Sequence, residues 1–238
     1  MRVLRTAWLL IVGVPVTAFY ASWAVLASWA GIRYAAGNVY DRIMRNWAAV
    51  ILAATGVSVK AEGLDRVDRA RSYVFVANHT SLVDIWALLV AVPNSFRFLA
   101  KRELARVPVL GRAMTSAGNI FIDRNNLASS FGSYDTAAAQ LERGLSAMVF
   151  AEGTRSLDGQ LLPFKKGPFV LAIRAGVPVV PVSIRGAFER TPKGALNVRP
   201  GEVVVEIGEP ISTVGLTYAD RDRLSDDARA VMLRLGAR

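Results

Sequence analysis

Short apolar runs alternate with amphipathic stretches along most of the chain after Gly56. Runs rich in β-branched and aromatic residues predict seven strands, at residues 57–62, 73–77, 96–100, 120–122, 147–151, 179–184 and 203–207. Apolar residues at helical spacing predict helices at residues 82–92, 109–117, 127–142, 168–175 and 218–235. Strands that alternate with helices favour an α/β fold, in which a mostly parallel central sheet is flanked by helices on both faces.

The N-terminal part of the chain has a different pattern, an apolar run without any charge over residues 7–32. A transmembrane helix needs about 20 apolar residues, so the run is long enough for one span. Arg2 and Arg5 ahead of the run also fit a signal peptide. Gly13 and Pro15 interrupt the run and fit an interfacial or re-entrant pair of helices. Among these alternatives we favour membrane attachment, by immersion from one face rather than by a crossing.

An amphipathic helix is predicted next, over residues 39–53, where apolar residues recur at helical spacing. Together with the apolar run it forms a helical N-terminal unit. We therefore divide the chain into a membrane-associated helical module at residues 1–55 and an α/β domain at residues 56–238. Within that domain, one connection stands out as rich in Pro and Gly, the segment RTPKGALNVRPG at residues 190–201.

Composition and net charge limit the kinds of molecule that this protein is expected to bind. The 238 residues are 53% hydrophobic and 20% charged, which excludes a disordered chain. The net charge of +10 favours a polyanionic partner, either nucleic acid, an anionic membrane surface or a phosphorylated substrate. Because the basic residues are dispersed and no aromatic–basic motif accompanies them, we expect no nucleic acid. The chain has no cysteine and one histidine, so we expect neither a disulfide framework nor a metal site.

The single histidine, His79, begins the segment HTSLVD, which follows a predicted buried strand and precedes an apolar helix. In α/β sheets, ligands bind at this end of the strands. A carboxylate such as Asp84 can fix the tautomer of an imidazole and stabilise its charged form, so the pair suits a general base. The proton would come from a substrate hydroxyl, because no Gly-x-Ser-x-Gly motif and no cysteine is present. The alternatives are a buried structural histidine and a helix capping box formed by Ser81 and Asp84.

Two later segments also place polar residues directly after a short apolar strand. They are GNIFIDR, which ends in Asp123 and Arg124, and AEGTRS, which contains Glu152, Gly153, Thr154 and Arg155. Gly153 permits close approach of the backbone to a ligand, and the guanidinium of Arg155 suits a phosphate. The alternatives are a surface ion pair in the first segment and a turn with an internal salt bridge in the second. Because carboxyl ends of parallel strands share one edge of a sheet, we expect both segments to lie near His79.

These motifs, in this order, resemble the sequence blocks of the glycerolipid acyltransferases, the family of 1-acyl-sn-glycerol-3-phosphate acyltransferases (lysophosphatidate acyltransferases). The matching segments are NHTSLVD, GNIFIDR, EGTRS and VPVVPV, which together span about residues 78–183. The chain departs from the family pattern at Ala151, where the family usually has proline before the EGTR run. That change affects the rigidity of the turn and no charged group.

The resemblance implies a reaction and a set of site residues. His79 resembles the general base that deprotonates the 2-hydroxyl of 1-acyl-sn-glycerol 3-phosphate, and Asp84 the acid that orients and stabilises it. The alkoxide would attack the thioester of acyl-CoA or acyl-carrier protein without an acyl-enzyme intermediate, giving phosphatidic acid. The residues that resemble the acyl-glycerol-phosphate-binding block, with two added by position, are Glu152, Gly153, Thr154, Arg155, Arg124 and Lys101.

The same resemblance implies the partners and the location. Lysophosphatidic acid, a thioester donor and a phospholipid bilayer are expected partners, and no cofactor is expected. A cytosolic donor implies the cytoplasmic face of the cell membrane and argues against a cleaved signal peptide, and each basic residue near an anionic surface would contribute roughly 1 kcal/mol to binding. Two alternatives stay open: the same fold could acylate lyso-ornithine lipid, another lysophospholipid or glycerol 3-phosphate, or the protein could be a non-catalytic binder of an anionic surface.

Overall fold

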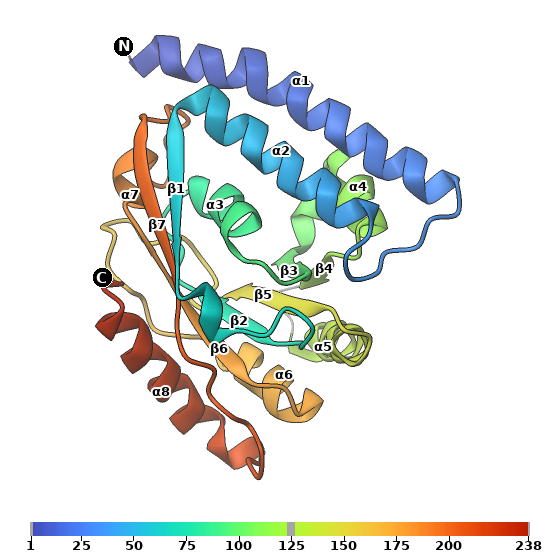
Figure 1. Ribbon diagram of the computed structural model, residues 1–238, viewed down its shortest axis with the longest axis vertical. Helices are drawn as coiled ribbons and strands as arrows, with labels where there is room; N and C mark the ends of the chain where they lie inside the picture. The colour runs from blue at the N-terminus through green and yellow to red at the C-terminus, as the bar shows by residue number, and fades with distance from the viewer. Residues whose placement is uncertain (1, 123–126, 238) are drawn as a thin grey trace.

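The computed structural model describes residues 2–122 and 127–237, and at their centre lies one seven-stranded sheet (Figure 1). The strands are β1 (Val57–Glu62), β2 (Val74–Ala77), β3 (Phe96–Lys101), β4 (Ile120–Ile122), β5 (Ser146–Phe150), β6 (Val179–Arg185) and β7 (Gly201–Ile207). Their order across the sheet is β1-β7-β6-β2-β5-β3-β4. Each lies within two residues of a strand predicted from the apolar pattern.

The direction of the strands confirms a mostly parallel sheet, with one reversal. From β6 through β2, β5 and β3 to β4 the neighbours are parallel, whereas β7 pairs antiparallel with β6, and β1 pairs parallel with β7. Because β7 returns beside β6, the connection between them stays at the edge where β6 ends. The carboxyl ends of β2 and β5 lie at the same edge. The segments HTSLVD and AEGTRS, which carry the predicted site residues, follow these two strands.

Helices cover both faces of the sheet, as predicted. They are α1 (Arg2–Trp29), α2 (Val39–Thr55), α3 (Val83–Ala91), α4 (Leu110–Ser116), α5 (Leu127–Glu142), α6 (Gly167–Ala175), α7 (Ala187–Arg190) and α8 (Arg221–Arg234). In Figure 1, α2 and α3 lie on one face, whereas α5, α6 and α8 lie on the other. Alternate residues of β2 enter the two cores, with Phe75 in the first and Val74 and Val76 in the second, because successive strand side chains point to opposite faces.

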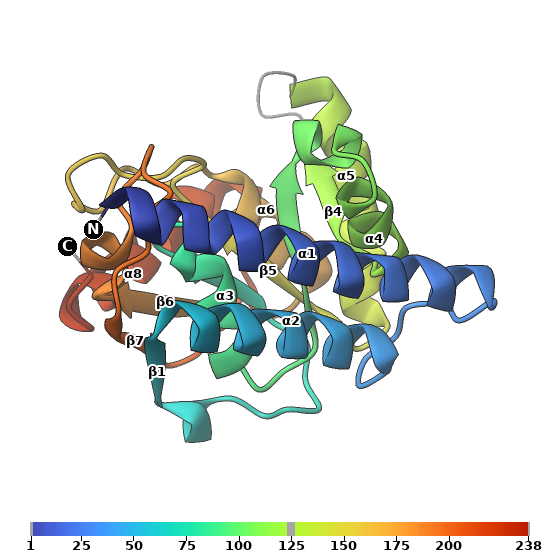
Figure 2. The same ribbon diagram turned by 90° about the horizontal axis from the view of Figure 1, so that it is seen from above.

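The apolar run at the N-terminus forms a single helix, α1, which is long and apolar enough to cross a membrane by length and composition. The alternative of two helices interrupted at Gly13 and Pro15 does not hold, because one helix runs through both residues. Pro15 lies inside the helix at an exposed position. The helix runs alongside α2 in both views and contacts α4 as well (Figures 1 and 2).

The N-terminal helices share their buried surface with the α/β domain. Leu9 of α1 and Ile51 of α2 belong to the same core cluster as Phe75 and Val205 of the sheet. The predicted boundary at residue 56 coincides with the turn at Gly56, which has φ 69° and ends α2. The division into two domains stays a prediction.

A buried ion pair also joins the N-terminal helices to the sheet. Arg97 of β3 is completely buried, and its Nη1 donates to Asp41 Oδ1 at 2.6 Å in the first turn of α2. The other oxygen of Asp41 accepts from Gly37 N at 2.7 Å and from Ser95 Oγ at 2.5 Å. The charge of one buried group is therefore balanced by the other, and the remaining lone pairs of the carboxylate are satisfied.

This pair gives a test of how firmly the helices are joined to the sheet. We expect Arg97→Met to lower the free energy of unfolding by about 3–5 kcal/mol, because Asp41 becomes an unpaired buried charge. Adding Asp41→Asn removes that charge and keeps an acceptor for Gly37 N, so the double variant should regain at least half of the loss. Urea unfolding in detergent micelles measures both. A double variant less stable than Arg97→Met would contradict this account.

Candidate active site

The loop after β2 is fixed at its first residue by Asn78. The side chain of Asn78 pairs in both directions with the backbone of Ile184 on β6, since Oδ1 accepts from Ile184 N at 2.7 Å and Nδ2 donates to Ile184 O at 2.9 Å. These bonds extend the β2–β6 pairing by one residue. The position of His79, the next residue, is therefore set by the sheet.

His79 and Asp84 are in direct contact, as the general-base hypothesis requires. His79 Nδ1 lies 2.8 Å from Asp84 Oδ2, and the same oxygen accepts from Thr80 N at 2.7 Å and from Ser81 N at 2.8 Å. Asp84 is completely buried. Two backbone N–H groups and the imidazole thus hold the carboxylate in a place that would otherwise be costly for a charge.

The capping role expected for Ser81 is only partly present. The helix α3 begins at Val83 with Leu82 as its N-cap, so Ser81 is not the cap residue. Its hydroxyl accepts from Val83 N at 3.1 Å, while Asp84 accepts from Ser81 N. The reciprocal bonds of a capping box therefore exist in a shifted form, and Asp84 serves the helix start and the histidine together.

The imidazole of His79 is held on one face by Phe150, the last residue of β5. The two rings stack with centroids 3.7 Å apart and planes inclined by 12°. The side chain remains 14% exposed. Since Nδ1 contacts Asp84, the exposed part of the ring leaves Nε2 as the nitrogen that a substrate can reach.

The EGTR turn after β5 encloses the backbone of the histidine. Glu152 is buried, and its two carboxylate oxygens accept from His79 N at 2.6 Å and from Leu162 N at 2.8 Å. Ser156 N donates to His79 O at 2.8 Å from the end of the same turn. Burial raises the pKa of Glu152 to about 7, although the hydrogen bonds from Leu162 N and His79 N oppose this shift. The carboxylate therefore joins two loops, and a direct contact of Glu152 with substrate stays a prediction.

The rest of this turn lies at the rim of the site. Gly153 has φ 74°, a conformation that glycine adopts without strain, and its N–H donates to Phe150 O at 3.0 Å. Thr154 is exposed and Arg155 is half-buried. The internal salt bridge considered as an alternative does not form, because Glu152 bonds to backbone groups. In the described part of the chain, no carboxylate forms an ion pair with Arg155.

Of the two further expected residues, the structure describes one, Lys101. Lys101 ends β3 and is exposed, and its Nζ lies 3.0 Å from Glu103 Oε1. It pairs in register with Ile122 of β4, so both strands end at the edge where the loops gather. Arg124, together with Asp123, lies outside the described residues.

Sequence reasoning missed Lys193, which the structure brings to the EGTR turn. Its Nζ donates to Thr154 Oγ1 at 3.2 Å and to Arg155 O at 3.0 Å. In an all-parallel sheet the chain after β6 would run to the opposite edge, so the sequence of residues 190–201 by itself indicates only a connection. The antiparallel return of β7 keeps this loop beside the site.

The sequence pattern of the acyltransferase family matches residues 58–185, more than half of the chain, and this range includes His79, Asp84 and the EGTR turn. The chain belongs to the acyltransferase family. This confirms the family that the motifs indicated.

Relatives of this acyltransferase cover nearly the whole chain. It is 33% identical over 221 residues to human 1-acyl-sn-glycerol-3-phosphate acyltransferase alpha, covering 91% of this chain and 78% of the human protein. It is 32% identical over 208 residues to the 1-acyl-sn-glycerol-3-phosphate acyltransferase of Limnanthes douglasii, covering 87% and 71%. The crystal structure of PlsC, the 1-acyl-sn-glycerophosphate (LPA) acyltransferase from Thermotoga maritima, has a TM-score of 0.77 and 28% identity, over 100% of this chain and 97% of that one.

Glu152 gives the acyltransferase a characteristic pH dependence of stability. Its pKa is raised from 4.5 to about 7 on folding, so the folded protein binds an extra proton between these values, and stability falls as pH rises through this window. We expect the wild type to lose about 3 kcal/mol of unfolding free energy relative to Glu152→Gln between pH 4.5 and pH 7.5. Urea unfolding in micelles at several pH values measures this difference. Parallel stability curves for the two proteins would show that Glu152 does not titrate there.

Proposed function

We propose that the protein transfers an acyl group from acyl-CoA or acyl-carrier protein to the 2-hydroxyl of 1-acyl-sn-glycerol 3-phosphate, giving phosphatidic acid. The observation that carries this proposal is the 2.8 Å contact between the lone histidine and a buried carboxylate, next to a turn whose arginine has no acidic partner among the described residues. The first feature suits the removal of a proton from an alcohol, and the second suits a phosphate. The names of the relatives support the same acceptor.

The geometry supports His79 as the general base. With Nδ1–H donated to Asp84 Oδ2, the lone pair of the neutral ring lies on Nε2, and the side chain is 14% exposed. Nε2 takes the proton of the 2-hydroxyl as its oxygen attacks the thioester carbonyl. The C–S bond then breaks, and the imidazolium returns the proton to the leaving thiolate. Asp84, with its charge held by Thr80 N and Ser81 N, stabilises the imidazolium between these steps.

The headgroup of the acceptor binds at the EGTR turn in this proposal. The guanidinium of Arg155 accommodates two phosphate oxygens, and the hydroxyl of Thr154 can donate to a third. Gly153 carries no side chain that would hold the headgroup away from the backbone. Lys101 and Arg124 add positive charge from the ends of β3 and β4, as the family resemblance implies.

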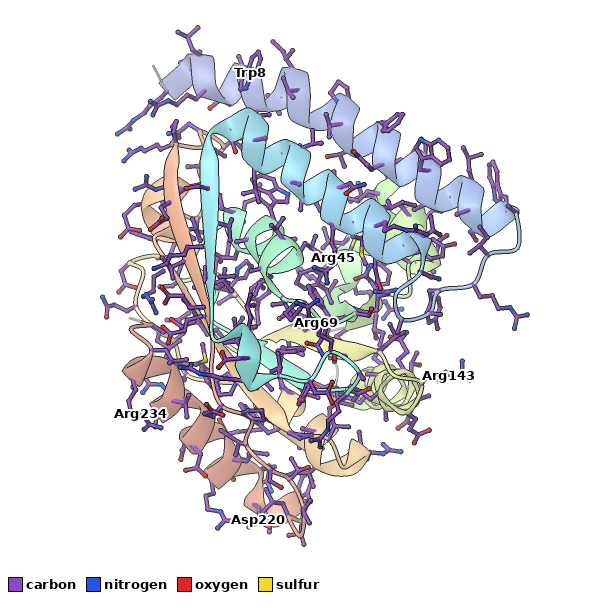
Figure 3. All side chains as sticks on the ribbon, viewed as in Figure 1. Trp8, Arg45, Arg69, Arg143, Asp220 and Arg234 are labelled. Carbon is purple, nitrogen blue, oxygen red and sulfur yellow. The ribbon has the colours of Figure 1, made fainter. Side chains whose placement is uncertain are left out.

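The bilayer holds the enzyme at its substrate through α1. This helix buries a narrow stripe of mostly small residues against its neighbours, and many of its large apolar side chains are exposed, as the sticks along the outer side of α1 show (Figure 3). The exposed apolar residues of the helix are Val3, Leu4, Trp8, Leu10, Ile11, Val14, Phe19, Trp23, Leu26 and Trp29. An apolar surface of this size on a packed helix suits immersion in a membrane from one face, here the cytoplasmic face, where a thioester donor is found.

The deciding experiment is the substitution His79→Ala in the full chain, assayed in mixed micelles with labelled acyl-CoA and a panel of acceptors. We expect the rate with 1-acyl-sn-glycerol 3-phosphate to fall by roughly a thousandfold or more, because the variant has no base for the hydroxyl proton. The variant should remain folded, and its sedimentation with anionic vesicles should not change.

Near-wild-type turnover by His79→Ala would exclude this mechanism. If the wild type acylated only lyso-ornithine lipid, another lysophospholipid or glycerol 3-phosphate, the acceptor assignment would be wrong while the role of His79 stood. Vesicle binding without transfer to any acceptor would favour the non-catalytic alternative.

A further inference from the structure

The connection from β6 to β7 is fixed beside the HTSLVD loop, which carries His79 and Asp84. Ser81 of that loop forms an isolated antiparallel β-bridge with Pro192. The preceding residue, Thr191, is completely buried, its N–H donates to Ala187 O at 3.1 Å, and its hydroxyl donates to Asn197 O at 3.3 Å. Lys193 therefore follows directly after two residues whose backbone or side chain is held in place.

The side chain of Lys193 reaches across to the EGTR turn. Its ammonium donates to the hydroxyl of Thr154 and to the carbonyl of Arg155, at 3.2 Å and 3.0 Å. Both acceptors are neutral, so these hydrogen bonds fix the position of the ammonium group but leave its positive charge unbalanced. An ammonium has three N–H groups, and the third is free to contact a ligand.

Some lysines near the EGTR turn have their charge balanced, whereas Lys193 and Lys165, whose side chain lies against Gly153, form no ion pair in the described ranges. Lys101 forms an ion pair with Glu103 at 3.0 Å, and Lys166 forms one with Asp222 at 3.2 Å. Neither Lys193 nor Arg155 has a carboxylate within ion-pair distance in the described ranges. Lys193 thus adds a second positive charge to the turn that carries Arg155, and a doubly charged phosphate monoester is an anion that can balance both.

We propose that Lys193 is a further binding residue for the phosphate of the acylated acceptor, acting beside Arg155. It holds the Thr154–Arg155 turn with two N–H groups and presents its charge and third N–H to the phosphate monoester. This inference rests on the proposed function, because it names a residue of the same headgroup site. The 3′-phosphate of CoA has the same chemistry, but the attachment of Lys193 to the turn that carries Arg155 favours the acceptor.

The test compares Lys193→Met with Lys193→Arg and with a matched control, Lys60→Met. Lys60 is an exposed lysine of β1 that pairs with Glu62 at 2.7 Å. KM is measured separately for 1-oleoyl-sn-glycerol 3-phosphate and for oleoyl-CoA, with the full chain in mixed micelles. We expect Lys193→Met to raise KM for the lysophosphatidate by roughly tenfold or more and to change kcat by less than about threefold, because a charged hydrogen bond made before and during reaction is lost. Lys193→Arg should restore most of the affinity, and Lys60→Met should match the wild type.

Three outcomes would overturn the assignment. An unchanged KM for the lysophosphatidate in Lys193→Met would remove Lys193 from the headgroup site. A rise only in KM for oleoyl-CoA would assign the lysine to the donor. A fall in kcat with both KM values unchanged would limit it to shaping the turn. These results differ from failure of the proposed function, which would appear as a wild-type protein that does not acylate the lysophosphatidate.

Discussion

The site depends on one buried carboxylate oxygen, Oδ2 of Asp84, at which three contacts converge. The imidazole of His79 and the N–H groups of Thr80 and Ser81 all lie within 2.8 Å of it. Because a buried charge is stable only when it is well paired, these bonds oblige the HTSLVD loop to keep one shape. That shape orients the imidazole and starts α3. The same interaction therefore serves the fold and the proposed chemistry, and a loss of Asp84 would affect both.

The sheet supplies the second constraint by bringing distant segments to one edge. The HTSLVD loop follows β2 and the EGTR turn follows its parallel neighbour β5, and Glu152 of that turn accepts from His79 N and from Leu162 N. The antiparallel return of β7 adds the loop that carries Lys193. In the arrangement we propose, the exposed apolar side chains of α1 rest in the bilayer surface. The lipid acceptor then reaches the site at the edge of the sheet from that surface.

Much of the fold and the pair His79–Asp84 could be predicted from sequence, because both are local. The strands β1 and β4 begin and end at the predicted residues, since strand length and apolar pattern coincide there. The direction of β7 could not be predicted, because alternation along a strand does not encode the direction of its neighbour, and Lys193 was missed for that reason. The continuity of α1 through Pro15 could not be predicted, because a proline inside an apolar run fits either a break or a tolerated interior position. The bonds of Glu152 depend on two backbone N–H groups, which side-chain motifs do not reveal, and the place of Arg124 stays a prediction.

The most direct test of the central claim is the protonation state of the imidazole. His79 is the only histidine, so ¹⁵N-histidine labelling of the intact protein in micelles gives signals from one ring. At a pH at which the ring is neutral, the account predicts a proton on Nδ1, bonded to Asp84, and an unprotonated Nε2. The substitution Asp84→Asn should disturb this tautomer. A proton on Nε2 in the wild type would contradict the account, because the nitrogen that faces the acceptor could not then take its hydroxyl proton.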